Sequence, residues 1–236
     1  MTQTKDDYII YNQQTVQNEF ESTYGEGWTF KWNSYQTPHR IIGKYISQNF
    51  DGNDPYQSEI VAREFISRHQ YLYGISEKNL QIQMNKKYGN LRYLIFNQVY
   101  NNIPVWNGRL DFRYRLNGDL VMIGHDAFPD LKLNTIPIIS KEQAIYYAKL
   151  EVHFDEIKDD EVVENPELFI WVEKAIQPIY HLAWQLTLFV HSTNPDDEVP
   201  VHRWKIFIDA HNGEILEKFD QVRHASLEGH VTASVK

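Results

Sequence analysis

The chain has 236 residues, a length that favours two compact units, each large enough for its own core. Its formal charge of -9 excludes a general nucleic-acid or anionic-membrane binder, because phosphate groups are repelled and no stripe of Lys and Arg compensates. The absence of cysteine excludes disulfides, thiolate metal sites and cysteine nucleophiles, and no apolar run approaches the ~18 residues that a membrane span needs.

Residues 1–57 predict an irregular N-terminal lead-in with short strands. Apolar and polar residues alternate briefly at 28–32 and at 41–45. Residues 1–20 lack the apolar core of about 7–15 residues that marks a secretory signal, so we expect that any signal has been removed.

A helix and a set of antiparallel strands are predicted from residue 58 onward. Between residues 61 and 72 the apolar residues recur three or four positions apart, which places them on one face of a helix. Gly74 is positioned to end this helix. Strand patterns follow at 79–84, 91–100, 109–116 and 121–124. Asn117-Gly118 is the dipeptide that most readily supplies two positive φ angles to a tight hairpin.

The second half of the chain repeats this organisation. Ser140-Lys141-Glu142-Gln143 is a capping-box pattern that predicts a helix running to about Val152. The acidic stretch 155–164 is interpreted as a solvated linker or loop in preference to a cation site. Strands are predicted at 168–174, 180–190 and 201–209, with a hairpin turn at Asn212-Gly213. Because the strands follow one another through hairpin turns, the sequence predicts an α+β fold with a boundary near 130–140.

No catalytic motif is found in the sequence. The chain has ten histidines but no H-E-x-x-H, and it contains neither a G-x-S-x-G string nor a phosphate-binding glycine loop. His181, His191 and His202 lie on predicted strands, where a hydrogen-bonded role is favoured over metal ligation. The tryptophans are interpreted as core residues in preference to a binding platform. We therefore expect a protein that is not an enzyme and that has no metal site and no cofactor.

Two strings carry a family resemblance. The first, from Phe96 to Gly108, resembles the F-x-Q-x-Y-x-G-I-P-V-x-G-G signature of the fungalysin/thermolysin propeptide (FTP) domain. Asn102 and Asn107 stand where the family has glycine, and Asn is the residue that best replaces glycine in a left-handed conformation. The positions matched to the signature are Phe96, Gln98, Tyr100, Asn102, Pro104, Val105 and Gly108.

The second string resembles the PepSY pattern, in which a Trp-led strand is followed by W-x-V-F-I-D-A-x-T-G-E-I-L. Here an Asp at the end of a strand can brace a tight turn in which a glycine supplies conformational freedom. Asn212 stands where the family often has Thr. The matched positions are Trp184, Trp204, Asp209, Ala210, Gly213 and Glu214.

The resemblance implies two cystatin-like units in tandem, each an antiparallel sheet with a helix. Residues 58–135 would form the FTP-like domain, 136–222 the PepSY-like domain, and 223–236 a linker and the start of a further β region. It also implies the pro-region of a secreted or periplasmic bacterial zinc metallopeptidase, a zymogen segment that acts as intramolecular chaperone and inhibitor. The implied partner is that attached or cognate peptidase.

Two other functions are compatible with the sequence. One is a free-standing secreted or envelope PepSY-type module that binds a peptide or an unrelated protease. The other is a metal-dependent hydrolase, for which the absence of ligand spacing leaves little support. A pH response through the histidines, which titrate near pH 6.5, is a further possibility for a pro-region.

Overall fold

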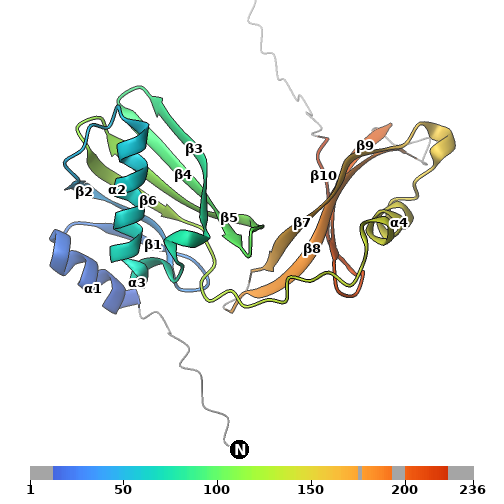
Figure 1. The fold of residues 1–236 in the computed structure, drawn as a ribbon, viewed down its shortest axis with the longest axis horizontal. Helices are drawn as coiled ribbons and strands as arrows, with labels where there is room; N and C mark the ends of the chain where they lie inside the picture. The colour runs from blue at the N-terminus through green and yellow to red at the C-terminus, as the bar shows by residue number, and fades with distance from the viewer. Residues whose placement is uncertain (1–12, 175–176, 193–199, 223–236) are drawn as a thin grey trace, which may run out of the picture. The chain divides into compact units, whose positions relative to one another are not determined.

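The computed structural model describes residues 13–174, 177–192 and 200–222. The fold is α+β, with few helices and with strands that form one mixed, largely antiparallel sheet (Figure 1). The chain divides into two compact units. Unit 1 contains the residues up to Ile136 together with Leu168–Leu182, and unit 2 contains Pro137–Glu167 together with the residues from Ala183 onward.

Unit 1 is built on antiparallel strands in the order β1-β2-β6-β5-β4-β3. Strand β5 also pairs in parallel with β7 at Val105 and Ile170. The elements of this unit are α1 (Gln13–Tyr24), β1 (Thr29–Trp32), β2 (Pro38–Ser47), α2 (Pro55–Arg68), α3 (Gln70–Tyr73), the 3-10 turn η1 (Glu77–Asn79), β3 (Leu80–Tyr88), β4 (Leu91–Tyr100), β5 (Ile103–Arg115) and β6 (Asp119–His125).

Three helices cover one face of this sheet (Figure 1). The core between them contains Phe20 from α1, Phe65 from α2 and Phe112 from β5, all fully buried. The predicted helix is interrupted at His69, whose Nδ1 lies 2.7 Å from the carbonyl of Phe65 and whose Nε2 lies 2.7 Å from the Tyr24 hydroxyl. Gly74, with φ 62°, ends the second segment as the sequence predicts.

Unit 2 contains one α-helix against an antiparallel sheet. Its elements are α4 (Lys141–Glu151), the 3-10 turn η2 (Glu156–Lys158), β7 (Glu161–Glu173), β8 (Ile179–His191), β9 (Val201–Asp209) and β10 (Ile215–Asp220), with β7 and β8 contributing residues to both units. The strands follow the order β7-β8-β9-β10. The predicted capping box is confirmed, since Ser140 and Gln143 exchange side-chain to backbone hydrogen bonds. Ala144 and Ala148 are fully buried, so α4 presents small residues where it lies close to its neighbours.

The N-terminal lead-in is better ordered than predicted. Residues 13–24 form helix α1, and β2 is ten residues long and pairs with β6, so this stretch is not irregular. Residues 13–57 belong to the same unit as the residues that follow them. The predicted β region at 223–236 lies outside the described residues.

The prediction of two positive φ angles at Asn117-Gly118 is wrong. Only Gly118 is left-handed, with φ 87°. Its backbone N–H donates to the carbonyl of Arg115 at 3.0 Å, which makes a three-residue loop in which glycine takes the last position. A Cβ at this position would lie 2.4 Å from the carbonyl oxygen of Phe50, so close approach also requires glycine here.

The acidic stretch 155–164 is not simply a solvated linker. Asp160 is 9% exposed and accepts hydrogen bonds from the backbone N–H groups of Asp155 and His191. Glu164 accepts from the Thr187 hydroxyl at 2.6 Å and from Lys205 at 3.1 Å. Apart from the N–H of Asp155, the partners of these carboxylates lie on β8 and β9, which the local sequence does not reveal.

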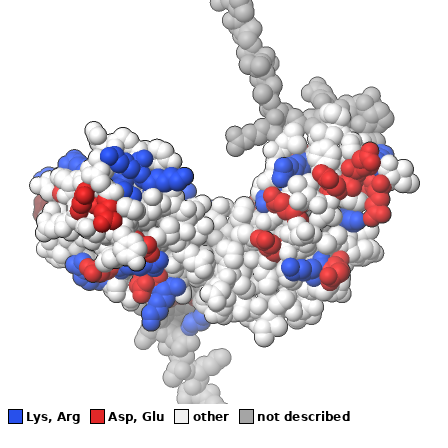
Figure 2. All heavy atoms as spheres, turned by 45° about the horizontal axis from the view of Figure 1, so that its top comes forward, with Lys and Arg blue, Asp and Glu red and all other residues white. Residues whose placement is uncertain are grey.

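Surface charge is mixed on the face drawn in Figure 2. Basic side chains gather along one edge of unit 1, and acidic ones gather at one end of the visible face of unit 2. No continuous basic stripe crosses that face. Among the described helices, none is long and apolar enough to cross a membrane.

Candidate functional site

The FTP-like string forms a hairpin turn and a bulge in unit 1. Asn101 and Asn102 have φ angles of 49° and 64°, and Tyr100 pairs with Ile103 across them. Two consecutive left-handed residues make the tight turn whose twist matches that of the flanking strands. Asn102 therefore adopts the left-handed conformation expected where the family has glycine.

Asn107 also adopts the left-handed conformation, with φ 60°, inside β5. The register between β4 and β5 shifts beside it, between Asn97 and Val99. A left-handed residue beside a register shift marks a β-bulge, a local irregularity that bends the strand and redirects its side chains. Asn107, which stands where the resembled signature has glycine, thus adopts a conformation that glycine tolerates best.

Gln98 lies inside the bulge and connects two distant segments of backbone. Its Nε2 donates to the carbonyl of Phe128 at 2.7 Å, and its Oε1 accepts from the N–H of Phe128 at 2.8 Å. The side chain is 2% exposed. A Cβ at Gly108 would lie 2.8 Å from Oε1 of Gln98, so glycine at 108 leaves the space that the amide occupies.

The remaining FTP-like positions belong to two apolar clusters. Phe96 is fully buried in the core beneath the helices of unit 1. Val105 is 4% exposed in a second cluster with Phe128 and Ile170, against which Tyr100 is partly buried. Pro104 lines a pocket beside the bulge.

The PepSY-like string forms a braced turn between β9 and β10 in unit 2. Oδ1 of Asp209 accepts from the backbone N–H groups of His211 at 2.8 Å and Asn212 at 3.2 Å. Gly213 has φ 83° and donates to the carbonyl of Asp209 at 2.9 Å. The carbonyl of Glu214 in turn accepts from the N–H of Asp209 at 2.8 Å. The bracing role predicted for Asp209 is confirmed by these contacts.

Of the other PepSY-like positions, Ala210 and Trp184 bind the segment before α4, and Trp204 contacts a ring on its own strand. The carbonyl of the buried Ala210 accepts from the N–H groups of Ile138 and Ile139, each at 2.8 Å. Trp184 donates its indole N–H to the carbonyl of Ile139 at 2.8 Å. Trp204 stacks on His202, with ring centroids 5.3 Å apart.

The predicted residues thus fall into two sets, one in each unit. A pocket with a volume of about 220 Å³ belongs to the first set. It lies beside the bulge, and its wall combines aromatic rings, side-chain amides and one guanidinium. The lining residues are Gln83, Asn97, Pro104, Val105, Trp106, Asn107, Gly108, Arg109 and Phe169.

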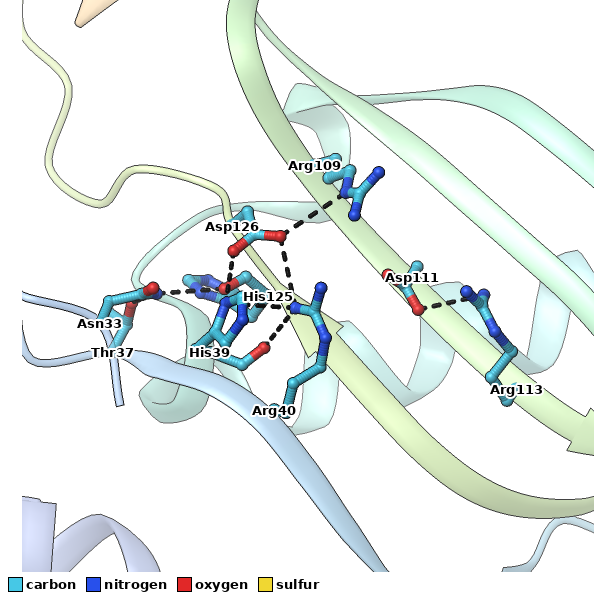
Figure 3. Close-up of polar contacts among 9 residues, drawn as sticks. All are labelled: Asn33, Thr37, His39, Arg40, Arg109, Asp111, Arg113, His125 and Asp126. Carbon is cyan, nitrogen blue, oxygen red and sulfur yellow. Dashed lines mark hydrogen bonds and ion pairs between the residues drawn. The ribbon is translucent and has the colours of Figure 1, made fainter. Parts of the chain in front are cut away.

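An ionic cluster next to this pocket was not predicted from the sequence. Asp126 is 2.6 Å from Nδ1 of His39, 3.3 Å from Arg40 and 3.5 Å from Arg109 (Figure 3). Burial raises the pKa of Asp126, but Arg40 and the hydrogen bond from His39 outweigh it and hold the pKa below its usual value. No local signal links residues 39 and 126, because only the pairing of β2 with β6 brings them together.

His125, the neighbour of Asp126, is fully buried. Its Nε2 donates to the carbonyl of Tyr73 at 3.1 Å, and its own carbonyl accepts from the Asn33 amide at 3.1 Å. Burial lowers its pKa to about 4. The imidazole is therefore neutral at physiological pH.

The histidines considered as metal ligands have other contacts. Nδ1 of His191 lies 2.9 Å from Asp160, and Nδ1 of His202 lies 2.7 Å from Asp220. His181 contacts the Trp171 ring. Within the described ranges no group of three or more His, Asp or Glu side chains is arranged to hold a metal ion.

Comparison with known proteins gives distant relatives. The chain is 24% identical to neutral protease B of Bacillus subtilis (strain 168) over 204 residues, which cover 83% of this chain and 36% of that protein. It is 25% identical to bacillolysin of Brevibacillus brevis over 138 residues, covering 56% of this chain and 24% of that protein. The chain is distantly similar to bacterial proteases. It aligns with only about a quarter to a third of each relative.

No family model matches the chain. Among solved structures, the C-terminal domain of Bacillus megaterium YpeB is similar with a TM-score of 0.38 and 15% identity, covering 89% of this chain and 96% of that one. An uncharacterized protein from Eubacterium rectale is similar with a TM-score of 0.35 and 11% identity, covering 67% of this chain and 55% of that one.

Proposed function

We propose that this chain is the non-catalytic pro-region of a secreted thermolysin- or fungalysin-type zinc metallopeptidase. In this proposal residues 58–135 form an FTP-like unit and 136–222 a PepSY-like unit, both cystatin-like. The chain assists folding of the attached peptidase and inhibits it until proteolysis separates the two. The catalytic residues belong to that partner.

One observation carries the proposal. The similarity to neutral protease B spans 83% of this chain but only 36% of the relative, which leaves most of the relative for a separate catalytic part. The geometry supports it, because Asn102 and Asn107 are left-handed at positions where the FTP signature has glycine, the residue that best tolerates this conformation. Asp209 and Gly213 likewise form the turn expected of the PepSY pattern.

Covalent attachment gives such a module a physical advantage. A short tether holds the inhibitor at an effective concentration of about millimolar, so modest contacts are enough to keep the peptidase occupied. Cleavage of the tether removes this advantage, and the inhibitor is then diluted. Inhibition by the separated chain is therefore expected to be measurable but weaker than inhibition in the precursor.

The first test is the reading frame itself. The proposal expects an H-E-x-x-H zinc motif on the same polypeptide, after residue 236. A reading frame without any zinc motif contradicts the proposal and favours a free-standing binding module.

The second test is inhibition in solution. The peptidase is expressed separately from the same reading frame, and its activity on a peptide substrate is titrated with purified chain 1–236. We expect saturable inhibition, and a higher yield of active enzyme when denatured peptidase is refolded with the chain present. An unrelated acidic protein of similar size is the control. Equal activity with the chain and with the control contradicts the proposal.

A further inference from the structure

The face of the unit 1 sheet that carries no helix has a distinctive set of side chains. Leu94 and Phe96 of β4 and Phe112 of β5 lie in the core beneath the helices, and the alternate positions of the two strands point to the other side. On that side β4 and β5 place Tyr93 opposite Arg113 and Asn97 opposite Arg109. The face therefore carries arginines in a chain whose total charge is -9.

Arg113 already has its partners. Its Nη1 lies 3.0 Å from Asp111, which is 2% exposed, and its guanidinium lies 4.3 Å from the centre of the Tyr93 ring. This arginine balances a buried carboxylate and is held by stacking, so it contributes little free positive charge.

Arg109 has a much weaker internal partner. The Asp126 carboxylate lies closer to His39 and Arg40 than to Arg109. Arg109 approaches it only through Nε, at 3.5 Å. Figure 3 shows the terminal nitrogens of Arg109 away from Asp126, and no other ion pair reaches them within the part of the chain that the structure describes. Arg40 and Arg109 share the single carboxylate of Asp126, so the two guanidinium charges exceed the one negative charge of that carboxylate.

The excess charge lies at the pocket beside the bulge. Arg109 is 45% exposed and lines the pocket together with the amides of Gln83 and Asn97. Trp106 and Phe169 form its aromatic wall, with ring centroids 5.7 Å apart in an edge-to-face arrangement. A guanidinium presenting two parallel donors is the group that best matches a carboxylate, and aromatic rings accept the methylene stem of a side chain.

We infer that this pocket docks an Asp or Glu side chain from the surface of the peptidase partner, with the carboxylate on the terminal nitrogens of Arg109. The stem of that side chain lies against Trp106 and Phe169. This inference rests on the proposed function and names a contact through which the chain recognises its peptidase. Charge complementarity selects an acidic partner residue for this pocket, because Arg109 attracts a carboxylate here. The rest of the chain is negatively charged and repels one.

The test uses two substitutions in chain 1–236, assayed against the peptidase from the same reading frame. Arg109→Gln removes the guanidinium, and we expect the inhibition constant to rise about tenfold. Asn97→Asp places a carboxylate opposite Arg109, where it pairs with the guanidinium and repels the incoming acid, and we expect at least the same loss.

Matched controls make the same chemical changes elsewhere in unit 1. Arg68→Gln alters a 61% exposed arginine on α2, and Asn18→Asp alters an exposed position on α1. Both controls are expected to inhibit like wild type, and urea unfolding checks that all four variants fold. Raising the salt concentration is expected to weaken wild type and to affect Arg109→Gln less.

The outcomes separate the two proposals. If wild type inhibits and both pocket variants inhibit equally well, the docking pocket is wrong and the proposed function stands. If wild type does not inhibit at all, both are wrong. Inhibition lost to the same degree in the pocket variants and in the controls indicates a general charge effect, and this also overturns the pocket.

Discussion

The side chain of Gln98 and the backbone of Phe128 form a reciprocal pair of hydrogen bonds, at 2.7 and 2.8 Å. The pair joins β4 to the segment that follows β6, 30 residues further along the chain. Both groups are buried, since Gln98 is 2% exposed and Phe128 is 1% exposed. The glutamine of the family signature thus has a structural task in this chain, which is to replace backbone pairing where the strands are bulged.

Replacement of Gln98 by Leu is expected to destabilise the fold strongly. The substitution keeps the volume but leaves the N–H and the C=O of Phe128 buried without partners, at a cost of about 3 kcal/mol. The free energy of unfolding is measured in urea, with Gln81→Leu at an exposed position on the neighbouring strand β3 as control. A loss no larger than that of the control means that the amide does not hold the two segments together.

Gly108→Ala is expected to cost about 2 kcal/mol, because overpacking forces the neighbouring side chain to move. The added Cβ would lie 2.8 Å from Oε1 and 3.1 Å from Cβ of Gln98. A double-mutant cycle with Gln98→Ala checks the cause. If the clash is with the glutamine, the two losses are less than additive. Strict additivity assigns the cost of Gly108→Ala to another neighbour.

Asn102 tests the interpretation of the hairpin turn. Its φ of 64° lies in the left-handed region. This region is costly for residues such as alanine, which have a Cβ but no polar side chain to stabilise the conformation. Asn102→Ala is therefore expected to lose about 1 kcal/mol, whereas Asn102→Gly is expected to be neutral or slightly stabilising. Urea unfolding of the two variants measures the difference, and equal stability of both argues against a conformational requirement at this turn.

Short sequence patterns correctly predicted those features of the fold that depend on neighbouring residues. The capping box at Ser140, the helix end at Gly74 and the left-handed Asn102 each depend on residues within a few positions along the chain. Helix α1 was missed because only Val16 and Phe20 of its residues are buried, and so small an apolar face is stable only when a sheet packs against it.

The pocket and the ionic cluster could be anticipated only in part. Pro104 and Gly108 belong to a string that the sequence singles out, and both line the pocket. Asp126 and His39 are 87 residues apart, and neither lies in a motif. Their contact depends on strand order and register, which a single sequence does not specify.

Because His125 is buried, we expect the free energy of unfolding to fall in acid. Burial lowers its folded-state pKa to about 4, while the unfolded chain has the ordinary value of about 6.5. Below pH 6.5 the unfolded state therefore binds a proton that the native state does not. The stability associated with the neutral imidazole is complete above this pH and is lost as the pH falls toward 4, by about 3 kcal/mol in total.

Urea unfolding at pH 7.5, 5.5 and 4.5 measures this loss, and His125→Gln separates it from other titrations. Glutamine can still donate to the carbonyl of Tyr73 but has no proton to gain, so the variant is expected to show a flatter dependence across this window. The half-buried Asp126, whose pKa lies below its ordinary value, contributes at more acidic pH, because its stabilisation is lost only when the carboxylate is protonated. His69 acts in the same direction as His125, since burial lowers its pKa also. An unchanged slope in His125→Gln would assign the acid sensitivity to other groups, with His69 the first to test.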